Sequence, residues 1–600
     1  MAKIGDLRRS AVVMTYGPGA IIDFKVGAAP VSVIASGIDE WDRRVPPEGI
    51  KNPQSIFEPR LQKRLNVKGF RLPPVVDDDA SSETLVGVRF PQWLQCPRCG
   101  TLQAANRWNG DPGRPEKRCG SCTSAAPGGR PVYVVPVRFV VACERGHIDD
   151  FPWHLWVGHK ESCAHRNELT LKTTGPGLAG LRLSCPKCGA FKSMEGIFQR
   201  SSLSHVGCRG KRPWLRGADE ICDQSVLAVQ RGASNIYFPD LHSALDIPPW
   251  SDRIQKLLGQ YWDPICQVDK SQREQFITIL SGVIGDTGMS AAELSALVDL
   301  RLKLLENVTA ESIRWDEYLQ LLVPSATAVD GSSEFEVRSE VVPEKLKGHL
   351  DCVTRVVRLR EVRALSGFTR ISPPSFADEN GKVQIAAIQS TPKDWLPAVE
   401  VRGEGIFARL NLEAVRLWES QQTVRQRAAH LNDLFRTEWQ ARSGTDESPP
   451  KVISPRFVLV HTFAHLLMRR LALECGYSTA SLRERLYVSS EPNEMAGVLI
   501  YTATSDADGT LGGLVRQGLA KRFESLVQGA LLDAQWCSSD PLCIDGAMSL
   551  AGALNGSACH ACALAPETSC EEFNQFLDRA YVVGLPSDSN VGFFSSLLTI

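Results

Sequence analysis

The chain of 600 residues contains 18 cysteines, and their types and spacing could support metal chemistry. Cys96 and Cys99 form one C-x-x-C pair, and Cys119 and Cys122 form a second pair shortly after it. Four thiolates supplied by two such pairs are typical of a tetrahedral zinc site. We therefore predict Zn²⁺ at this quartet, in a structural role, because four thiolates leave no coordination position for water or substrate.

Two further metal sets are predicted in the next part of the chain. The first joins a C-x-x-C pair to two widely spaced thiols: Cys185, Cys188, Cys208 and Cys222. The second combines two thiols and two imidazoles: Cys143, His147, Cys163 and His165. Zinc accepts both donor sets. For the first set, the alternative is that other ligands complete the pair formed by Cys185 and Cys188. For the second set, the alternative is that the histidines orient loops and the cysteine at 143 ends a buried strand.

Five cysteines near the C-terminus compete for four ligand positions. We expect the metal ligands to be Cys537, Cys543, Cys559 and Cys562. Cys570 is the rival ligand, and His560 lies between two of the candidates and could replace one of them.

Two histidines, His461 and His465, lie one turn apart on a predicted helix. This i, i+4 spacing can bind zinc, but the segment HTFAH lacks the glutamate of the HExxH motif. The apolar neighbours FVLV and LLM favour a packed helix. We therefore expect a core or interface role for both histidines, with metal binding as the alternative.

The helices and strands that must position these candidate ligands are expected to form an α+β multidomain protein. We expect four consecutive regions: an N-terminal segment with a Gly-Pro-Gly turn (1–90), a zinc-ribbon-like β region (91–225), a mixed and largely helical middle (226–380) and a C-terminal α/β unit (381–600). Short strands in the cysteine-rich region bury little apolar surface, so bound metal would have to stabilise them. Helical periodicity runs from Ala291 to Val323, with Leu297, Leu300, Leu304 and Leu305 on a repeating face.

Composition excludes several classes of protein. Lys and Arg number 67 against 68 for Asp and Glu, so a globally basic nucleic-acid binder is not expected. The sequence contains no long uncharged apolar run of the kind that predicts a membrane span. The N-terminal segment MAKIGDLRRSAVV lacks the apolar core of a secretory signal. We expect a cytoplasmic protein with reduced thiols. No G-x-x-x-x-G-K-[ST] motif is present, and no G-x-G-x-x-G motif opens a βαβ unit, so ATP hydrolysis by this chain alone is not expected.

Local basic segments are the candidate DNA contacts. Four arginines alternate with apolar residues, and a Lys-Arg pair lies beside Trp214: Arg355, Arg358, Arg360, Arg363, Lys211 and Arg212. Such arrays can contact a phosphate backbone, although a solvated strand or helix face has the same pattern.

A metal-dependent nuclease or phosphodiesterase is an alternative interpretation, because imidazole and carboxylate ligands can hold an open metal ion. Its candidate ligands form two sets: His461, His465, Glu491 and Asp506, or His147, Asp149 and Asp150.

Several segments together resemble the DrmB family, the helicase-partner subunits of DISARM anti-phage defence systems. The segments are LRRSAVVMTYGPGAIIDF (7–24), VRFVVACERGHIDDFPWHLWVGH (137–159), HTFAHLLMRRLALECGY (461–477), ERLYVSS (484–490), LGGL (511–514) and ACHACALAPETSCEEFNQFLDR (558–579). The C-terminal segments are also similar to the zinc-binding helicase-associated domain of Mrf-type DNA-repair helicases.

The resemblance implies a non-catalytic bacterial accessory subunit that pairs with DrmA, a superfamily-two helicase. DrmA would supply ATP binding and translocation, and the two chains would contact DNA jointly. The family's C-terminal metal site would fall on the four cysteines predicted there. A stand-alone zinc-ribbon DNA-binding module is the remaining alternative.

Overall fold

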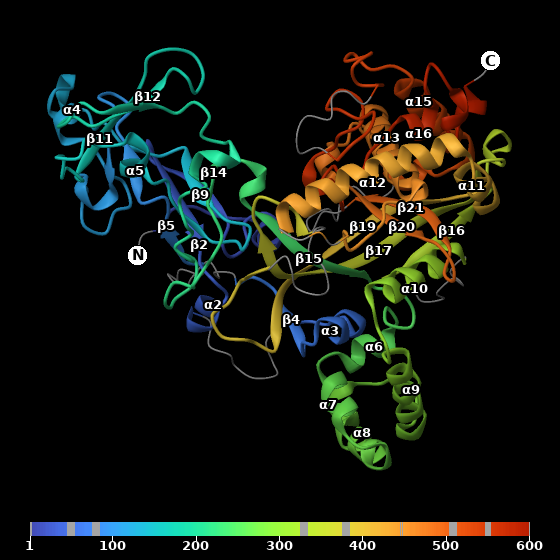
Figure 1. Ribbon diagram of the computed structural model, residues 1–600. Helices are drawn as coiled ribbons and strands as arrows, with labels where there is room; N and C mark the ends of the chain where they lie inside the picture. The colour runs from blue at the N-terminus through green and yellow to red at the C-terminus, as the bar shows by residue number, and fades with distance from the viewer. Residues whose placement is uncertain are drawn as a thin grey trace. The chain divides into compact units, whose positions relative to one another are not determined.

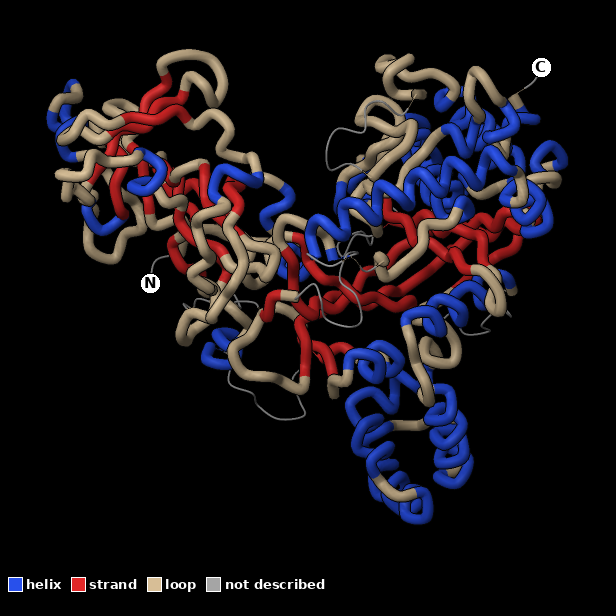
Figure 2. The backbone as a smooth tube through the Cα atoms, viewed as in Figure 1, coloured by secondary structure: helices blue, strands red, loops and turns tan. Residues whose placement is uncertain are grey.

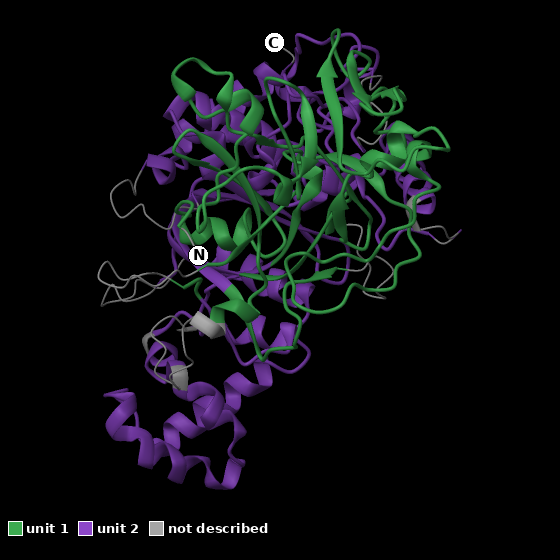
Figure 3. Ribbon diagram, turned by 90° about the vertical axis from the view of Figure 1, so that its left-hand side faces the viewer, with its two compact units in different colours: residues 1–53, 72–241, 364–397 green, residues 54–71, 242–363, 398–600 purple. Residues whose placement is uncertain are grey.

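The computed structural model describes residues 3–44, 55–74, 85–323, 334–374, 385–443, 446, 448–502, 513–545 and 554–598. These residues form two compact units (Figure 3). Unit 1 comprises 1–53, 72–241 and 364–397, and unit 2 comprises 54–71, 242–363 and 398–600. The four consecutive regions expected from the sequence differ from this division, because each unit combines segments that are far apart in the chain. Helices and sheets are both abundant (Figure 2), as the predicted α+β class requires.

Unit 1 is built mainly from short antiparallel strands in three sheets. The first has the order β1 (Ile21–Val26), β2 (Ala29–Ala35), β5 (Gly87–Arg89), and the second the order β10 (Ile148–Asp150), β9 (Phe139–Ala142), β14 (Leu227–Gln230). The third has the order β13 (Phe191–Ser193), β12 (Leu181–Ser184), β11 (Glu168–Thr173), β7 (Thr101–Ala104), β6 (Trp93–Gln95), β8 (Val135–Pro136). Its helices are α1 (Arg9–Met14), α2 (Asp39–Arg44), α4 (Gly120–Ser124) and α5 (Trp153–Val157).

Arg370 holds three loops of unit 1 together. It is fully buried, and its guanidinium donates hydrogen bonds to the carbonyl oxygens of Gly19 (2.7 Å), Gly146 (2.8 Å) and Ile236. Because burial disfavours the charged form, the pKa of Arg370 falls to about 9. Gly19 ends the predicted Gly-Pro-Gly turn with φ +88°, and a Cβ there would lie 2.4 Å from the ring of Phe368, so only glycine fits.

Unit 2 contains the larger part of a sheet with the order β15 (Phe238–Leu245), β17 (Leu350–Thr369), β19 (Trp395–Leu410), β21 (Met495–Thr502), β20 (Leu482–Ser489). Residues 238–241, 364–369 and 395–397 of these strands belong to unit 1. Short strands of unit 2 pair with it: β16 (Glu336–Glu340) with β17, and β4 (Gly69–Arg71) with β19 and with β3 (Ser55–Ile56). The short strand β18 (Ala386–Ala387) belongs to unit 1, where it pairs with Gly367 and Phe368 of β17. The helix α3 (Pro59–Leu65) lies between β3 and β4.

Helices cover both faces of this sheet (Figure 1). The N-terminal group is α6 (Arg253–Leu258), α7 (Trp262–Gln267), α8 (Lys270–Ile284), α9 (Ala291–Leu304) and α10 (Ala310–Leu322). Of these, α10 contacts β20 and β21, whereas α7, α8 and α9 project away from the sheet (Figure 1). The C-terminal group is α11 (Leu412–Glu419), α12 (Gln422–Ser443), α13 (Pro455–Cys475), α14 (Gly513–Gln517), α15 (Ala520–Ala534) and α16 (Ala580–Val583). Among the described residues, no helix combines the length and apolar character that a membrane crossing requires.

The helical pattern predicted from Ala291 to Val323 divides into α9 and α10. Thr309 accepts a hydrogen bond from the backbone N–H of Ser312 and so begins a second helix after a left-handed Asn307. The buried face of α9 carries Leu294 and Val298, whereas the predicted face is partly wrong: Leu300 is 57% exposed. Sequence periodicity located the helices but did not identify which apolar stripe meets the core.

Ser454 and Gly476 fix the ends of α13, the longest apolar helix of unit 2. The Ser454 hydroxyl accepts a hydrogen bond from the backbone N–H of Phe457, and Gly476 ends the helix in the left-handed conformation with φ 70°. Between these caps the helix packs against β20, β21 and α15. Both histidines of the HTFAH segment are consequently buried.

A buried ion network crosses the interior of unit 2. Arg485 on β20 binds both carboxylate oxygens of Glu317 at 2.7 Å, and Arg363 binds Glu361 at 2.6 Å. Tyr501 donates a further hydrogen bond to Glu361 at 2.9 Å. These side chains are almost completely buried, so each charge depends on its partner for stabilisation.

We expect Arg485→Met to destabilise unit 2 by about 3–5 kcal/mol, because it leaves the Glu317 carboxylate buried without its guanidinium partner. Urea unfolding should show a clearly lower midpoint for this variant. The matched control is Arg436→Met, since Arg436 is 51% exposed and pairs with an exposed Asp433. Equal midpoints for the two variants would contradict the expected importance of the network.

Candidate metal centres

The first quartet is brought together at one end of the six-stranded sheet of unit 1. Cys96 and Cys99 lie in the turn between β6 and β7, where Gly100 adopts φ 76°. Cys119 and Cys122 lie at the start of α4. Sγ atoms are 3.8 Å apart for Cys96 and Cys122 and 3.9 Å apart for Cys99 and Cys119.

These separations fit a bound zinc ion and exclude disulfides. A disulfide brings sulfurs to about 2.05 Å, whereas four thiolates around Zn²⁺ with Zn–S bonds of about 2.3 Å lie about 3.8 Å apart. Burial opposes ionisation of Cys99, but hydrogen bonds with Thr101 outweigh it and lower the pKa of Cys99 to about 7. Burial raises the pKa of Cys119 to about 12, so the thiols of the quartet differ in how readily they ionise, and metal binding would have to displace the remaining protons.

A second quartet forms from Cys143, His147, Cys208 and Cys222. The Cys143 Sγ lies 3.4 Å from His147 Nδ1, 3.6 Å from Cys208 Sγ and 4.0 Å from Cys222 Sγ. The other ring nitrogen, His147 Nε2, lies 2.8 Å from a carboxylate oxygen of Glu220. A carboxylate in this position holds a metal-ligating imidazole in the required tautomer and orientation.

Hydrogen bonding to Cys143, and to His147, lowers the pKa of Cys208 to about 4. The same hydrogen bond, together with burial, raises the pKa of Cys143. The four residues form a Cys3His donor group of a kind that suits zinc.

A third quartet forms from His159, Cys163, Cys185 and Cys188. His159 Nδ1 lies 3.7 Å from Cys188 Sγ, and its Nε2 lies 2.9 Å from His154 Nδ1. Hydrogen bonds from the backbone N–H groups of Lys160 and Ala190 lower the pKa of Cys188 to about 6. This is again a Cys3His donor group with a partner on the distal imidazole nitrogen.

The structure groups these ligands differently from the sequence expectation. Cys208 and Cys222 join Cys143, because β14 pairs with β9 and brings the segment before Leu227 next to the end of β9. Cys163 joins Cys185, because β11 and β12 pair at Thr170 and Ser184 and bring together the segments at their ends. Strand pairing, which the spacing of cysteines does not reveal, decides which thiols meet.

His165 lies outside these quartets. Its Nε2 lies 3.1 Å from the carbonyl oxygen of Glu168, within its own turn. The candidate ligand that sequence reasoning missed is His159, which ends the segment WHLWVGH and lies four residues before Cys163. This His-x3-Cys spacing is the signal that could have identified it.

The C-terminal quartet brings together the four thiols expected there. Cys537 and Cys543 meet Cys559 and Cys562, with Sγ separations of 3.5 Å for Cys537–Cys559 and 3.6 Å for Cys543–Cys562. Hydrogen bonding to Cys537 and to the Ala561 backbone overcomes burial and lowers the pKa of Cys559 to about 7. Neither His560 nor Cys570 belongs to this quartet; Cys570 lies instead beside His461, at 3.1 Å.

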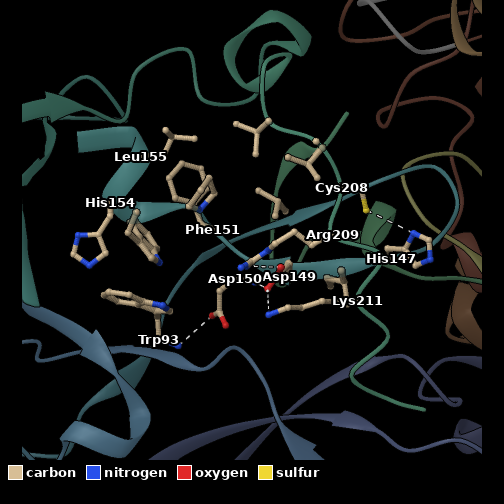
Figure 4. A pocket seen from close by; sticks show the side chains of 17 residues that line it. Trp93, His147, Asp149, Asp150, Phe151, His154, Leu155, Cys208, Arg209 and Lys211 are labelled. Carbon is tan, nitrogen blue, oxygen red and sulfur yellow. Dashed lines mark hydrogen bonds and ion pairs between the residues drawn. The ribbon is translucent and has the colours of Figure 1, made fainter. Parts of the chain in front are cut away.

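A pocket of about 390 Å³ opens beside the second quartet (Figure 4). Asp149 lies in this pocket and pairs with Arg209 at 2.5 Å and Lys211 at 3.4 Å, as the dashed lines of Figure 4 show. Both basic side chains remain substantially exposed, at 64% and 40%. Lys211, a candidate DNA contact, is therefore accessible to solvent at the mouth of a pocket.

Asp150, beside Asp149, faces the backbone and not an open metal position. Its carboxylate accepts hydrogen bonds from the backbone N–H groups of Gln92 and Trp93 at 3.2 and 3.1 Å, and burial raises the pKa of Asp150 to about 6. The imidazole of His147 faces sulfur on one side and Glu220 on the other. This arrangement does not support an open nuclease centre at His147, Asp149 and Asp150.

The second proposed nuclease set is also not assembled among the described residues. His461 and His465 meet Glu484, while Glu491 is exposed in the turn after β20. Asp506 and the first two residues of the LGGL segment lie outside the described residues.

The arginines of β17 form internal ion pairs. Arg355 pairs with Glu340 at 2.6 Å, and Arg360, 12% exposed, pairs with Asp246 at 2.7 Å and with Glu400. Arg363 is buried against Glu361, and Arg358 is half-buried beside β16. The expected row of phosphate contacts therefore fails for Arg360 and Arg363, whose guanidinium groups neutralise internal carboxylates. Arg212 pairs with Glu220 and is 24% exposed.

Comparison with known proteins agrees with this architecture. Residues 8–238 match a family described as a domain of unknown function (DUF8724), and residues 463–563 match the MrfA Zn-binding domain. The chain is 32% identical over 568 residues to a protein named DISARM protein DrmB from Bacillus paralicheniformis, an alignment that covers 91% of this chain and 97% of that protein.

The fold and its thiol-rich quartets define a mixed α/β protein with a C-terminal zinc-binding domain of the MrfA type. The resemblance noted from the sequence is thereby confirmed. The chain belongs to the DrmB family of DISARM defence proteins.

Proposed function

We propose that this chain is a non-catalytic accessory subunit of a DISARM anti-phage defence complex. The observation that carries the proposal is the similarity to a DISARM DrmB protein along 91% of the chain. The four cysteine-rich quartets support a scaffold role, since a closed four-ligand site stabilises a fold and does not activate water.

We further propose that each of the four quartets holds Zn²⁺. Two quartets supply four thiolates, and two supply three thiolates and one imidazole. These donor sets and their separations fit tetrahedral zinc, whose contribution there is to cross-link short strands. The free thiols of all 18 cysteines fit a reducing compartment, and we place the protein in the cytoplasm.

The partner we propose is the superfamily-two helicase subunit, DrmA, which supplies ATP hydrolysis and DNA translocation. DNA would be contacted jointly, with Lys211 and Arg209 as the contribution of this chain, because both lie exposed at a pocket mouth. Asp149 partly neutralises them, which favours binding shared with a second, more basic surface.

Co-expression of a tagged chain with the helicase of its own operon tests the partnership. We expect the two to co-purify at a fixed ratio through a salt wash, with DNA-stimulated ATPase activity in the complex and none in this chain alone. ATP turnover by the isolated chain, or failure of the two chains to associate, would contradict the proposal. Incubation of the isolated chain with labelled DNA and Mn²⁺ tests the nuclease alternative, which intact DNA would exclude.

We expect Lys211→Ala with Arg209→Ala to weaken DNA binding by the complex and to reduce the slope of log affinity against log salt by about 2. The cause is the loss of two phosphate contacts and their released counterions. The control is Lys25→Ala, an exposed lysine on β1 of the same unit. An unchanged slope would show that Lys211 and Arg209 do not contact DNA in the complex. A steep slope in the isolated chain would instead favour a stand-alone DNA-binding module.

A further inference from the structure

Unit 2 contains a fifth cluster of metal-binding side chains that none of the cysteine quartets includes: His461, His465, Glu484 and Cys570. The two histidines lie one turn apart on α13, Glu484 lies on β20, and Cys570 follows a short 3-10 helix (Glu567–Ser569). The side chains of the histidines and of Glu484 have no exposed surface, and Cys570 is 7% exposed. We propose that these four residues form a buried, closed metal site for a divalent ion of the Zn²⁺ class.

The donor atoms converge on one point. His461 Nε2 lies 3.1 Å from Cys570 Sγ and 3.2 Å from Glu484 Oε1, and His465 Nε2 lies 3.5 Å from Glu484 Oε2. The four donor atoms all lie within 4.8 Å of one another. Zinc bonds of about 2.0–2.3 Å in a tetrahedron place neighbouring ligand atoms roughly 3.3–3.6 Å apart, so a single ion fits with small adjustments.

Two buried polar atoms of the cluster face each other at 3.5 Å without a hydrogen bond, and a bound cation would satisfy both. His465 Nε2 and Glu484 Oε2 are buried and make no hydrogen bond with another residue. Leaving such a group unsatisfied costs about 1–3 kcal/mol, and more when it is charged. A cation between them would satisfy both atoms at once.

A hydrogen bond on the far side of His465 prepares the imidazole for a metal. His465 Nδ1 lies 2.9 Å from the carbonyl oxygen of Ala563. Only a protonated nitrogen can donate to a carbonyl, so in the neutral imidazole the lone pair remains on Nε2, which faces the cluster. This is the usual support for a metal-ligating histidine. Ala563 directly follows Cys562, so the contact links this site to the C-terminal quartet.

The chemistry of the donors specifies the class of ion. One carboxylate and one thiolate together carry two negative charges, which a dication neutralises in an interior that disfavours net charge. Two imidazoles, one oxygen and one sulfur suit Zn²⁺ and related first-row ions and do not suit Ca²⁺ or Mg²⁺. Because four protein ligands fill a tetrahedron, the site would join α13, β20 and the segment after residue 569 without binding substrate.

Metal analysis of the purified full-length protein tests the proposal. We expect five divalent ions per chain, one for each cluster, and four in each of the isosteric variants Cys570→Ser and Glu484→Gln. The control is Cys475→Ser at the end of α13, which should retain all five. Four ions in the wild type, with no loss in either variant, would overturn the proposed site. The four side chains would then form a metal-free network of hydrogen bonds.

The absorption spectrum of the cobalt-substituted protein is a second test of the site, for the case in which a variant folds poorly. In Co²⁺-loaded wild-type protein we expect, besides the intense sulfur-to-cobalt bands of the thiolate-rich quartets, a weaker contribution from a single-thiolate site. The difference spectrum between the wild type and Cys570→Ser should show that contribution alone, while the four quartets remain loaded. An unchanged cobalt spectrum would refute the site. This readout does not depend on the helicase partnership, so its failure is distinct from failure of the proposed function.

Discussion

Replacing Cys559 with serine is expected to release the metal of the C-terminal quartet and to unfold the segment around it. Thiols dominate the small core there: the buried residues are Cys537, Cys543, Ala558, Cys559, Cys562, Ala563 and Leu577. Structural zinc in small domains contributes apparent free energies of about 10–16 kcal/mol. Such a core cannot compensate for that loss with apolar burial alone. Metal analysis should show one ion fewer, and limited proteolysis should cut the segment 537–577 rapidly.

The matched control is Cys352→Ser, because Cys352 is half-buried in β17 and belongs to none of the five clusters. It should keep the wild-type metal content and resist proteolysis. Rapid cleavage of the control to the same extent as Cys559→Ser would show that the loss reflects general instability and not a metal site. Normal metal content in Cys559→Ser would exclude this cysteine as a ligand.

Pairs of substitutions in unit 1 are expected to distinguish the quartets of the structure from those suggested by spacing. Cys143→Ser with Cys208→Ser should remove one ion, because both thiols belong to the second quartet. Cys208→Ser with Cys185→Ser should remove two ions, because these thiols belong to different quartets. The grouping by sequence spacing predicts the opposite numbers, so a metal count on the two double variants decides between them.

Single substitutions of Cys143, Cys208 and Cys185 provide the baseline, with one ion lost in each. A loss of two ions from Cys143→Ser with Cys208→Ser would contradict the grouping that strand pairing produces. Circular dichroism of each variant would show whether the two sheets around these sites remain folded.

The sequence alone identified the family of this protein and the residue types that could bind metal. C-x-x-C pairs are local features, and a turn such as that between β6 and β7 places both thiols on one side whatever the rest of the chain does. The first and C-terminal quartets could therefore be predicted, since each is built on such a pair and its neighbours. The ends of α13 were also predictable, because Gly476 terminates a long apolar stretch.

The buried faces of the middle helices were less predictable. The pattern through α9 is apolar on more than one side, so periodicity did not distinguish Val298, which is buried, from Leu300, which is exposed. The arginines of β17 present the same problem. Alternation predicted a basic face, but carboxylates from other strands and segments, such as Glu400 and Asp246, neutralise it in the folded unit.

Only the tertiary structure decided which distant candidate ligands lie close enough to share a metal ion. His159 joins Cys185, and His461 joins Glu484 and Cys570, across separations that no local motif spans. Metal coordination requires four donor atoms within a few ångströms of one another, and for distant donors that proximity results from strand pairing and helix packing. The residue types that bind metal were determined by the sequence, whereas their partners were determined by the fold.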